Sequence, residues 1–189
     1  MQDFTEMVNR QRAYFLTQAT KPYGFRLEKL RALSGWIDDN ENAVLEALAQ
    51  DLGKCAFEGY LTEVAMVRQE IRDALRHLAE WMHPRRVRTA VGQFPGRCRI
   101  YSEPYGVVLI MSPWNYPFQL TVAPLIGAIA AGNCAVVKPS AYSAATSALL
   151  RRMAQELFAP EHVAVVEGGR EENARLLEQR FDFIFFTGS

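Results

Sequence analysis

The stretch "YGVVLIMSPWNYPF", residues 105–118, joins a run of apolar residues to a short segment of prolines and aromatics. The apolar run, 106–111, is short and continuous, which predicts a strand buried on both faces of a sheet. Two prolines, two large aromatic residues and one amide, Asn115, follow directly. Because proline fixes its own backbone and cannot continue a central strand, a rigid turn is predicted where this buried strand ends.

Strands and helices alternate from this stretch to residue 189. The expected elements are strands over 106–111, 134–140, 162–169 and 181–189 and helices over 118–132, 143–158 and 171–180. Ser143 is expected to cap the second of these helices. Near-continuous apolar strands separated by helices are typical of a parallel sheet covered on both faces. The sequence therefore predicts the α/β fold class.

The first 83 residues show a helical pattern instead. Apolar residues recur three and four positions apart within 27–37, 44–52 and 60–82, as in amphipathic helices that pack on a core. Gly53 is a plausible C-terminal cap of the second helix. Short strands around a turn at 92–97 are expected next. We therefore divide the chain into an N-terminal helical part (1–83), a bridging hairpin (84–104) and a sheet-forming part (105–189).

Overall charge gives no reason to expect a polyanionic partner. Lys and Arg number 21, as do Asp and Glu, so the chain has no net field to attract nucleic acid or an anionic membrane. One basic stretch, 85–88, lies near Arg97 and Arg99. We interpret it as a solvated hairpin or a subunit contact in preference to a polyanion site. We expect no nucleic-acid partner.

Cysteine and histidine usage predicts a protein of a reducing compartment. Three cysteines lie far apart, which argues against a disulfide framework, and neither they nor the three histidines have metal-ligand spacing. We expect no metal site. The N-terminus lacks the apolar core of a signal peptide, and the most apolar region, 120–137, is interrupted too soon to span a bilayer. A cytoplasmic protein without a transmembrane segment is expected.

Polar and small residues follow each predicted strand of the sheet. The strand ends carry Trp114 and Asn115, Lys138 and Ser140, Gly168 and Gly169, and Thr187, Gly188 and Ser189. In open parallel sheets, ligands bind outside the carboxyl ends of the strands. We therefore expect a site at this edge.

Each of these residues has a chemical and a structural interpretation. Lys138 could bind a ribose or a phosphate, or could simply reach solvent. Asn115 offers an amide that suits an oxyanion formed during a reaction, or it could bridge backbone groups between two turns. The segment 187–189 could open a phosphate-binding turn or an ordinary loop. For 168–169 a structural turn is favoured, because the glutamates that follow would repel a phosphate.

Three segments resemble one known family. They are "EPYGVVLIMSPWNYPFQLTVAPLIGAIAAGNCAVVKPS" (103–140), "RFDFIFFTGS" (180–189) and "QDLGK" (50–54). The chain resembles the aldehyde dehydrogenase superfamily from about residue 5 to its end, and the wording "WNYPF" is most similar to its class 3 branch. The resemblance implies an incomplete Rossmann-like sheet after a bridging hairpin that favours a homodimer in the full-length protein.

The resemblance also implies roles for individual residues. Asn115 matches the asparagine that stabilises the thiohemiacetal oxyanion, so it is the candidate catalytic residue. The candidate cofactor-binding residues are Trp114, Lys138, Ser140, Thr187, Gly188 and Ser189. Among these, Lys138 matches a lysine on the adenosine ribose, and Gly188 begins the pyrophosphate turn. The implied reaction is thiolate attack on an aldehyde, hydride transfer to NAD or NADP, and thioester hydrolysis.

Two departures from the family pattern limit what the chain itself is expected to do. Ala141 stands where the family usually has a glutamate that holds the ribose hydroxyls, so the choice between NAD and NADP stays open. The general-base glutamate and the nucleophilic cysteine lie beyond "FTGS" in the family, and Cys134 is expected to be inert packing. We therefore expect the N-terminal portion of an aldehyde dehydrogenase, inactive alone. The alternative is a stand-alone, non-catalytic nucleotide-binding or dimerisation module.

Overall fold

The apolar runs of the second half form one parallel sheet in the computed structural model, which describes residues 4–188. Its four strands lie in the order β5-β4-β3-β6. Their bounds are β3 (Val107–Met111), β4 (Cys134–Lys138), β5 (Val163–Val165) and β6 (Phe183–Phe186). The predicted α/β class is confirmed. Lys138 is the last residue of β4, and the other described polar residues expected at the strand ends lie in the loops that follow the strands.

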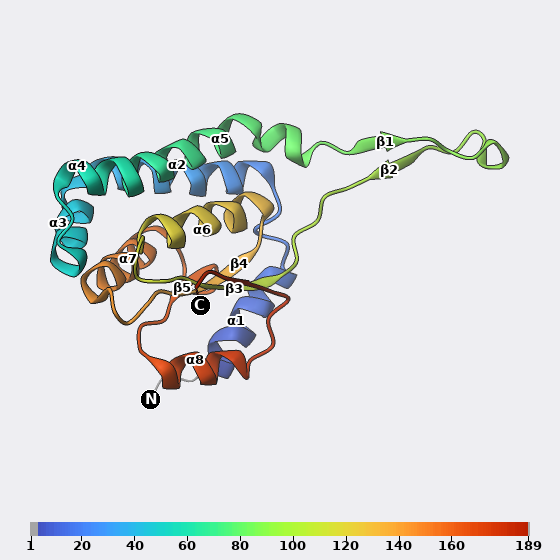
Figure 1. The fold of residues 1–189 in the computed structure, drawn as a ribbon. Coiled ribbons are helices and arrows are strands. Elements are labelled where there is room, and N and C mark those ends of the chain that lie inside the picture. Colours follow the sequence, from blue (N-terminus) through green and yellow to red (C-terminus); the bar gives the residue numbers. More distant parts are fainter. Residues whose placement is uncertain (1–3, 189) are drawn as a thin grey trace.

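Side chains of the central strands alternate between two separate cores. One core contains Val108, Ile110, Ala135 and Val137, and the other contains Val107, Leu109, Met111, Cys134 and Val136. Helices α2 (Tyr23–Asp39), α5 (Ala65–Met82), α6 (Gln119–Ala131) and α7 (Ala144–Leu157) cover the first face, and α1 (Phe4–Leu16) and α8 (Arg170–Leu177) cover the second (Figure 1). This arrangement explains why β3 is apolar throughout and β4 is apolar up to Lys138, since neither face meets water.

Helices form over the predicted segments with shifts at their ends, and two further helices, α1 and α4 (Ala56–Gly59), form where no separate helix was predicted. Their bounds are α1 (Phe4–Leu16), α2 (Tyr23–Asp39), α3 (Glu41–Leu52), α4 (Ala56–Gly59), α5 (Ala65–Met82), α6 (Gln119–Ala131), α7 (Ala144–Leu157) and α8 (Arg170–Leu177). Gly53 ends α3 with a φ of 68°, as expected of a cap. The third N-terminal stripe is not one helix, because a π-helical turn, η1 (Tyr60–Val64), precedes α5. The division at residues 83 and 104 stays a prediction.

The expected cap of α7 was wrong. Ser143 occupies the N-cap position, but its hydroxyl donates to the carbonyl oxygen of Ser140 and makes no capping bond. The cap comes from Asp51, whose carboxylate accepts the backbone N–H groups of Ala145 at 3.0 Å and Thr146 at 2.7 Å. A carboxylate at the positive end of the helix dipole stabilises α7. It also attaches the N-terminal helices to the sheet.

The predicted hairpin forms and extends away from the rest of the chain (Figure 1). Strands β1 (Arg85–Val87) and β2 (Cys98–Ile100) pair antiparallel, with a short 3₁₀ turn, η2 (Val91–Gln93), between them. Apolar side chains on this hairpin are exposed, Phe94 at 87% and Val91 at 93%. A lone two-stranded ribbon is marginally stable in water, so this arm suits contact with a further surface.

Strand β6 lies at an open edge of the sheet. All four of its side chains are exposed by 40% or more, although all are large and apolar. A flat apolar edge strand pairs readily with another chain. The 189-residue chain is therefore expected to self-associate in light scattering. Ile184→Lys should shift it toward the monomer, whereas Leu177→Lys, which replaces an exposed apolar residue of α8, should not. A wild-type chain that stays monomeric at high concentration would refute this expectation.

Within residues 4–188, no helix is both long enough and apolar enough to cross a bilayer.

Candidate active-site cleft

A cleft of about 610 Å³ opens at the carboxyl edge of the sheet. Five of the residues predicted from the sequence line it: Trp114, Asn115, Ser140, Thr187 and Gly188. They come from the ends of three different strands, as expected for a ligand site in a parallel sheet. Of the other two predicted residues, Lys138 lies buried beneath this edge, and Ser189 lies outside the described residues.

The turn after β3 is fixed by hydroxyl groups as well as by its prolines. The hydroxyl of Thr121 donates to the carbonyl oxygen of Pro117 at 2.6 Å. Since that hydrogen is used, the hydroxyl of Ser112 is the donor in its 2.5 Å contact with Thr121. Both hydroxyls are buried. The first turn of α6 therefore holds the segment 112–117 at its beginning and at its end.

Asn115 lies at the exposed tip of this turn. Its backbone carbonyl oxygen accepts a hydrogen bond of 3.0 Å from the ammonium of Lys54. Its side-chain amide makes no hydrogen bond with any residue between 4 and 188, so both of its N–H groups are available to a ligand in the cleft. A fixed backbone that carries a free amide donor suits the stabilisation of a developing oxyanion.

Lys54 belongs to a buried ion pair that the sequence did not indicate. Its ammonium lies 2.5 Å from a carboxylate oxygen of Glu63, and the side chains are exposed by only 8% and 0%. The second carboxylate oxygen of Glu63 accepts the backbone N–H groups of Phe118 and Gln119, at the beginning of α6. Lys54 stands in the "QDLGK" segment, but no role had been assigned to it. The sequence sign that could have indicated a buried partner is that Glu63 stands within the apolar stripe of 60–82.

Lys138 is buried, with 3% of its surface exposed, so it does not reach solvent. Its ammonium donates to the carbonyl oxygens of Pro139 at 2.9 Å and Gly168 at 2.6 Å. Burial lowers the pKa of Lys138, and the carboxylate of Glu172 partly offsets this effect. An ammonium has three N–H donors, so one is left for a ligand hydroxyl at the sheet edge.

The pair Gly168–Gly169 forms the structural turn that the sequence favoured. The carboxylate of Glu172 accepts the backbone N–H of Gly169 at 2.7 Å. Gly168 has a φ of 125°, and a Cβ there would lie 2.5 Å from Glu172. Only glycine therefore fits this position. The turn presents the carbonyl oxygen of Gly168 to Lys138, so it acts on the site through that lysine.

The thiol of Cys134 is confirmed as packing. It is fully buried in β4, and burial raises its pKa to about 12. At neutral pH such a thiol stays protonated and is a poor nucleophile. Cys55 is exposed and Cys98 is half-buried, and neither lines the cleft.

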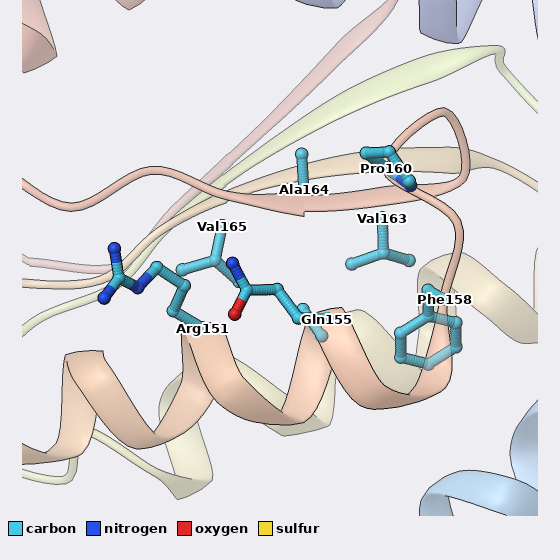
Figure 2. A pocket seen from close by; sticks show the side chains of 8 residues that line it. Arg151, Gln155, Phe158, Pro160, Val163, Ala164 and Val165 are labelled. Carbon is cyan, nitrogen blue, oxygen red and sulfur yellow. The ribbon is translucent and has the colours of Figure 1, made fainter. Parts of the chain in front are cut away.

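A second hollow, of about 390 Å³, lies between α7 and β5 (Figure 2). Val163 and Val165 point from the strand toward the helix, and Ala164 points the opposite way (Figure 2). Arg151, on the rim, pairs with Glu167 at 3.0 Å. None of the residues predicted for the site lines this hollow.

The carboxyl edge of the sheet brings a buried ammonium, a hydroxyl-bearing segment and a glycine close to the cleft. The free donor of Lys138 suits a ribose hydroxyl, and a φ of 151° at Gly188 lets the backbone turn without a side chain toward the cleft. Ala141 is exposed and offers no carboxylate to a ribose.

Comparison with known proteins gives one consistent result. A model of the "Aldehyde dehydrogenase family" matches residues 1–189. The 4,4'-diaponeurosporen-aldehyde dehydrogenase of Staphylococcus aureus is 45% identical, over 94% of this chain and 39% of that protein. Aldehyde dehydrogenase family 3 member B1 of Bos taurus is 43% identical, over 100% of this chain and 40% of that protein.

A solved structure of Staphylococcus aureus AldH in a substrate-bound state superposes with a TM-score of 0.97 at 43% identity. The match covers all of this chain and 41% of that one. The chain thus spans about 40% of the length of the curated relatives it matches. Because the family model extends over all 189 residues, the chain belongs to the aldehyde dehydrogenase family.

Proposed function

We propose that this chain is the N-terminal portion of an NAD(P)-dependent enzyme that oxidises an aldehyde to a carboxylic acid. The observation that carries the proposal is the free amide of Asn115, held over a cleft at the carboxyl edge of the sheet. The family match and its coverage of about 40% of the relatives support the same conclusion. The nucleophile and the general base would then come from the remainder of such an enzyme.

Asn115 acts on the oxygen of the aldehyde. When a thiolate adds to the carbonyl carbon, the oxygen gains negative charge, and the N–H of the Asn115 side chain donates to it. The donor is oriented before the reaction, so little reorganisation is needed as the charge develops. Trp114 immediately precedes Asn115 and is 52% exposed. It contributes an apolar surface at the same end of the cleft.

The other predicted residues hold the cofactor. Lys138 would donate to a ribose hydroxyl, while Ser140, Thr187, Gly188 and the following residue, Ser189, would surround the phosphates. NAD or NADP, when bound, supplies the acceptor for the hydride that leaves the substrate carbon. The chain's own residues bind and orient the nucleotide and keep its reactive end beside Asn115.

The full-length enzyme is proposed to be a cytoplasmic homodimer joined through the β1–β2 hairpin. The hairpin exposes Val91 and Phe94 far from the body of the chain, and these side chains would be covered by a second copy. The arginines of the hairpin would then lie at a subunit contact. The balanced charge of the whole chain gives no reason to assign them to a polyanionic partner instead.

A chimera tests the proposed function. In it, residues 1–189 replace the matching part of Staphylococcus aureus AldH, the structure superposed above. We expect the chimera to oxidise aldehydes with NAD or NADP, and the chain alone to show no turnover. The intact AldH serves as the reference for folding and for rate.

Two results would contradict the proposal. One is a folded chimera without activity beside an active reference enzyme. The other is a stable, monomeric 189-residue chain that binds NAD or NADP with low micromolar affinity in calorimetry. The second result would favour a stand-alone nucleotide-binding module.

A further inference from the structure

The turn that carries Asn115 is held from below by Lys54 and Glu63. Lys54 lies just after α3 and contacts the carbonyl oxygen of Asn115 at 3.0 Å. Glu63 lies in the π-helical turn η1 and accepts the N–H of Phe118 at 2.8 Å. The two side chains contact each other at 2.5 Å. One ion pair therefore joins both ends of the segment 115–118 to the N-terminal helices.

The ammonium of Lys54 is engaged by groups of the protein itself. It donates hydrogen bonds to Glu63 and to the Asn115 carbonyl oxygen, and it lies 4.1 Å from the centroid of the Tyr116 ring, a cation–π contact. Lys54 does not line the cleft. Its effect must pass through the turn.

Stability alone does not account for this pair. Burying two charges is costly, and apolar residues of similar volume often stabilise a protein as well or better. What apolar residues could not do is fix a carbonyl oxygen and a helix N-terminus at the same time. The π-helical turn that contributes Glu63 supports the same interpretation, since such turns are often found at functional sites.

We infer that Lys54 and Glu63 are positioning residues that set the Asn115 amide for oxyanion stabilisation. The inference rests on the proposed function of Asn115. A hydrogen bond at the carbonyl of residue 115 fixes the peptide plane from which the side chain extends. A misplacement of about 1 Å in an active site can lower the rate on the order of 100-fold.

A double-mutant cycle in the Staphylococcus aureus chimera tests this inference. Lys54→Met keeps an unbranched side chain that is one atom shorter, and it removes the charge and the donors. We expect it to lower kcat about tenfold to 100-fold with little change in the KM for NAD or NADP. In the Asn115→Ala background, the same change should lower kcat little further, because the amide that it positions is already absent.

Arg26→Met is the matched control. Arg26 is also a buried cation, 6% exposed, and donates to the carbonyl oxygens of Thr20 and Ala130, away from the cleft. Its replacement should lower the unfolding temperature and leave kcat nearly unchanged. Glu63→Gln is measured in parallel, because it keeps the side-chain volume and one acceptor oxygen. It should lower kcat in the same non-additive manner.

The outcomes separate the inference from the proposal on which it rests. If Asn115→Ala leaves kcat unchanged, the proposed function of Asn115 fails. Suppose that Asn115→Ala lowers kcat strongly. If Lys54→Met and Glu63→Gln then lower only stability, or if each lowers kcat by the same factor with and without Asn115→Ala, the pair is structural. The inference is then overturned, and the proposed function stands.

Discussion

Asn115→Ala is expected to lower the turnover number of the chimera about 100- to 1000-fold, because it removes one oxyanion donor worth about 3–4 kcal/mol in the transition state. The affinity for NAD or NADP should hardly change, since the amide faces the reacting carbonyl. Steady-state kinetics with calorimetric titration of the cofactor measures both quantities. The side chain makes no hydrogen bond within residues 4–188, so its loss should leave the fold intact.

Tyr142→Ala is the control for this prediction. Tyr142 also lines the cleft, and it is 84% exposed. Its removal takes away contact surface without an oxyanion donor, so the turnover number should stay near that of the parent chimera. A near-normal rate of the chemical step in the Asn115→Ala chimera would show that the Asn115 amide does not stabilise the oxyanion.

The second large effect is a loss of stability in mild acid caused by His162. This side chain is 1% exposed and lies among the rings of Tyr14, Phe25 and Phe158. Burial lowers its pKa to about 4, helped by the positive charge of Lys29 and partly offset by the backbone of Asn133. The native state therefore resists a proton that the unfolded chain accepts at its ordinary pKa of about 6.5.

The sign of the pH dependence follows from this difference. Between pH 6.5 and pH 4 the unfolded state binds more protons, so the free energy of unfolding falls as the pH falls. Above pH 6.5 His162 does not lower the free energy of unfolding, and at pH 4 it lowers that free energy by about 3 kcal/mol. Urea unfolding of the Ile184→Lys chain, in which association is suppressed, measures this slope.

His162→Phe should flatten the slope, because a phenyl ring cannot titrate and its surroundings are aromatic. His83→Gln replaces an exposed histidine and should leave the slope unchanged. Equal slopes in the Ile184→Lys chain with and without His162→Phe would show that another group governs the acid sensitivity.

Local patterns were sufficient to predict the sheet and the edge at which the cleft lies. Apolar runs such as 106–111 occur in strands buried on both sides, and the strand ends then place Asn115 and Thr187 in one cleft. The strand bounds were too long, as in 162–169, where only Val163–Val165 pairs. Backbone pairing ends where the chain leaves the sheet. Apolar residues can continue beyond that position, so hydropathy does not predict the last paired residue.

Long-range polar contacts could not be predicted. The cap of α7 is Asp51, 94 residues before Ala145, whereas the local rule favoured Ser143. Glu63 holds the beginning of α6 from 55 residues away. Such partners depend on how helices pack, and neither residue type nor spacing indicates them. Lys138 was identified from its strand end, but its burial against two carbonyl oxygens emerged only from the fold.

Arg12 of α1 binds the carboxylate of Asp182, 170 residues later, just before β6. This contact has a consequence during protein synthesis. At about 5–20 residues per second, a ribosome needs roughly 10–30 s to make the intervening chain. Throughout that time the apolar face of α1, with Phe4, Met7 and Val8, has no finished sheet to cover it. Helix α1 is therefore docked only after the sheet has been synthesised, and its apolar face suits a chaperone that binds nascent chains.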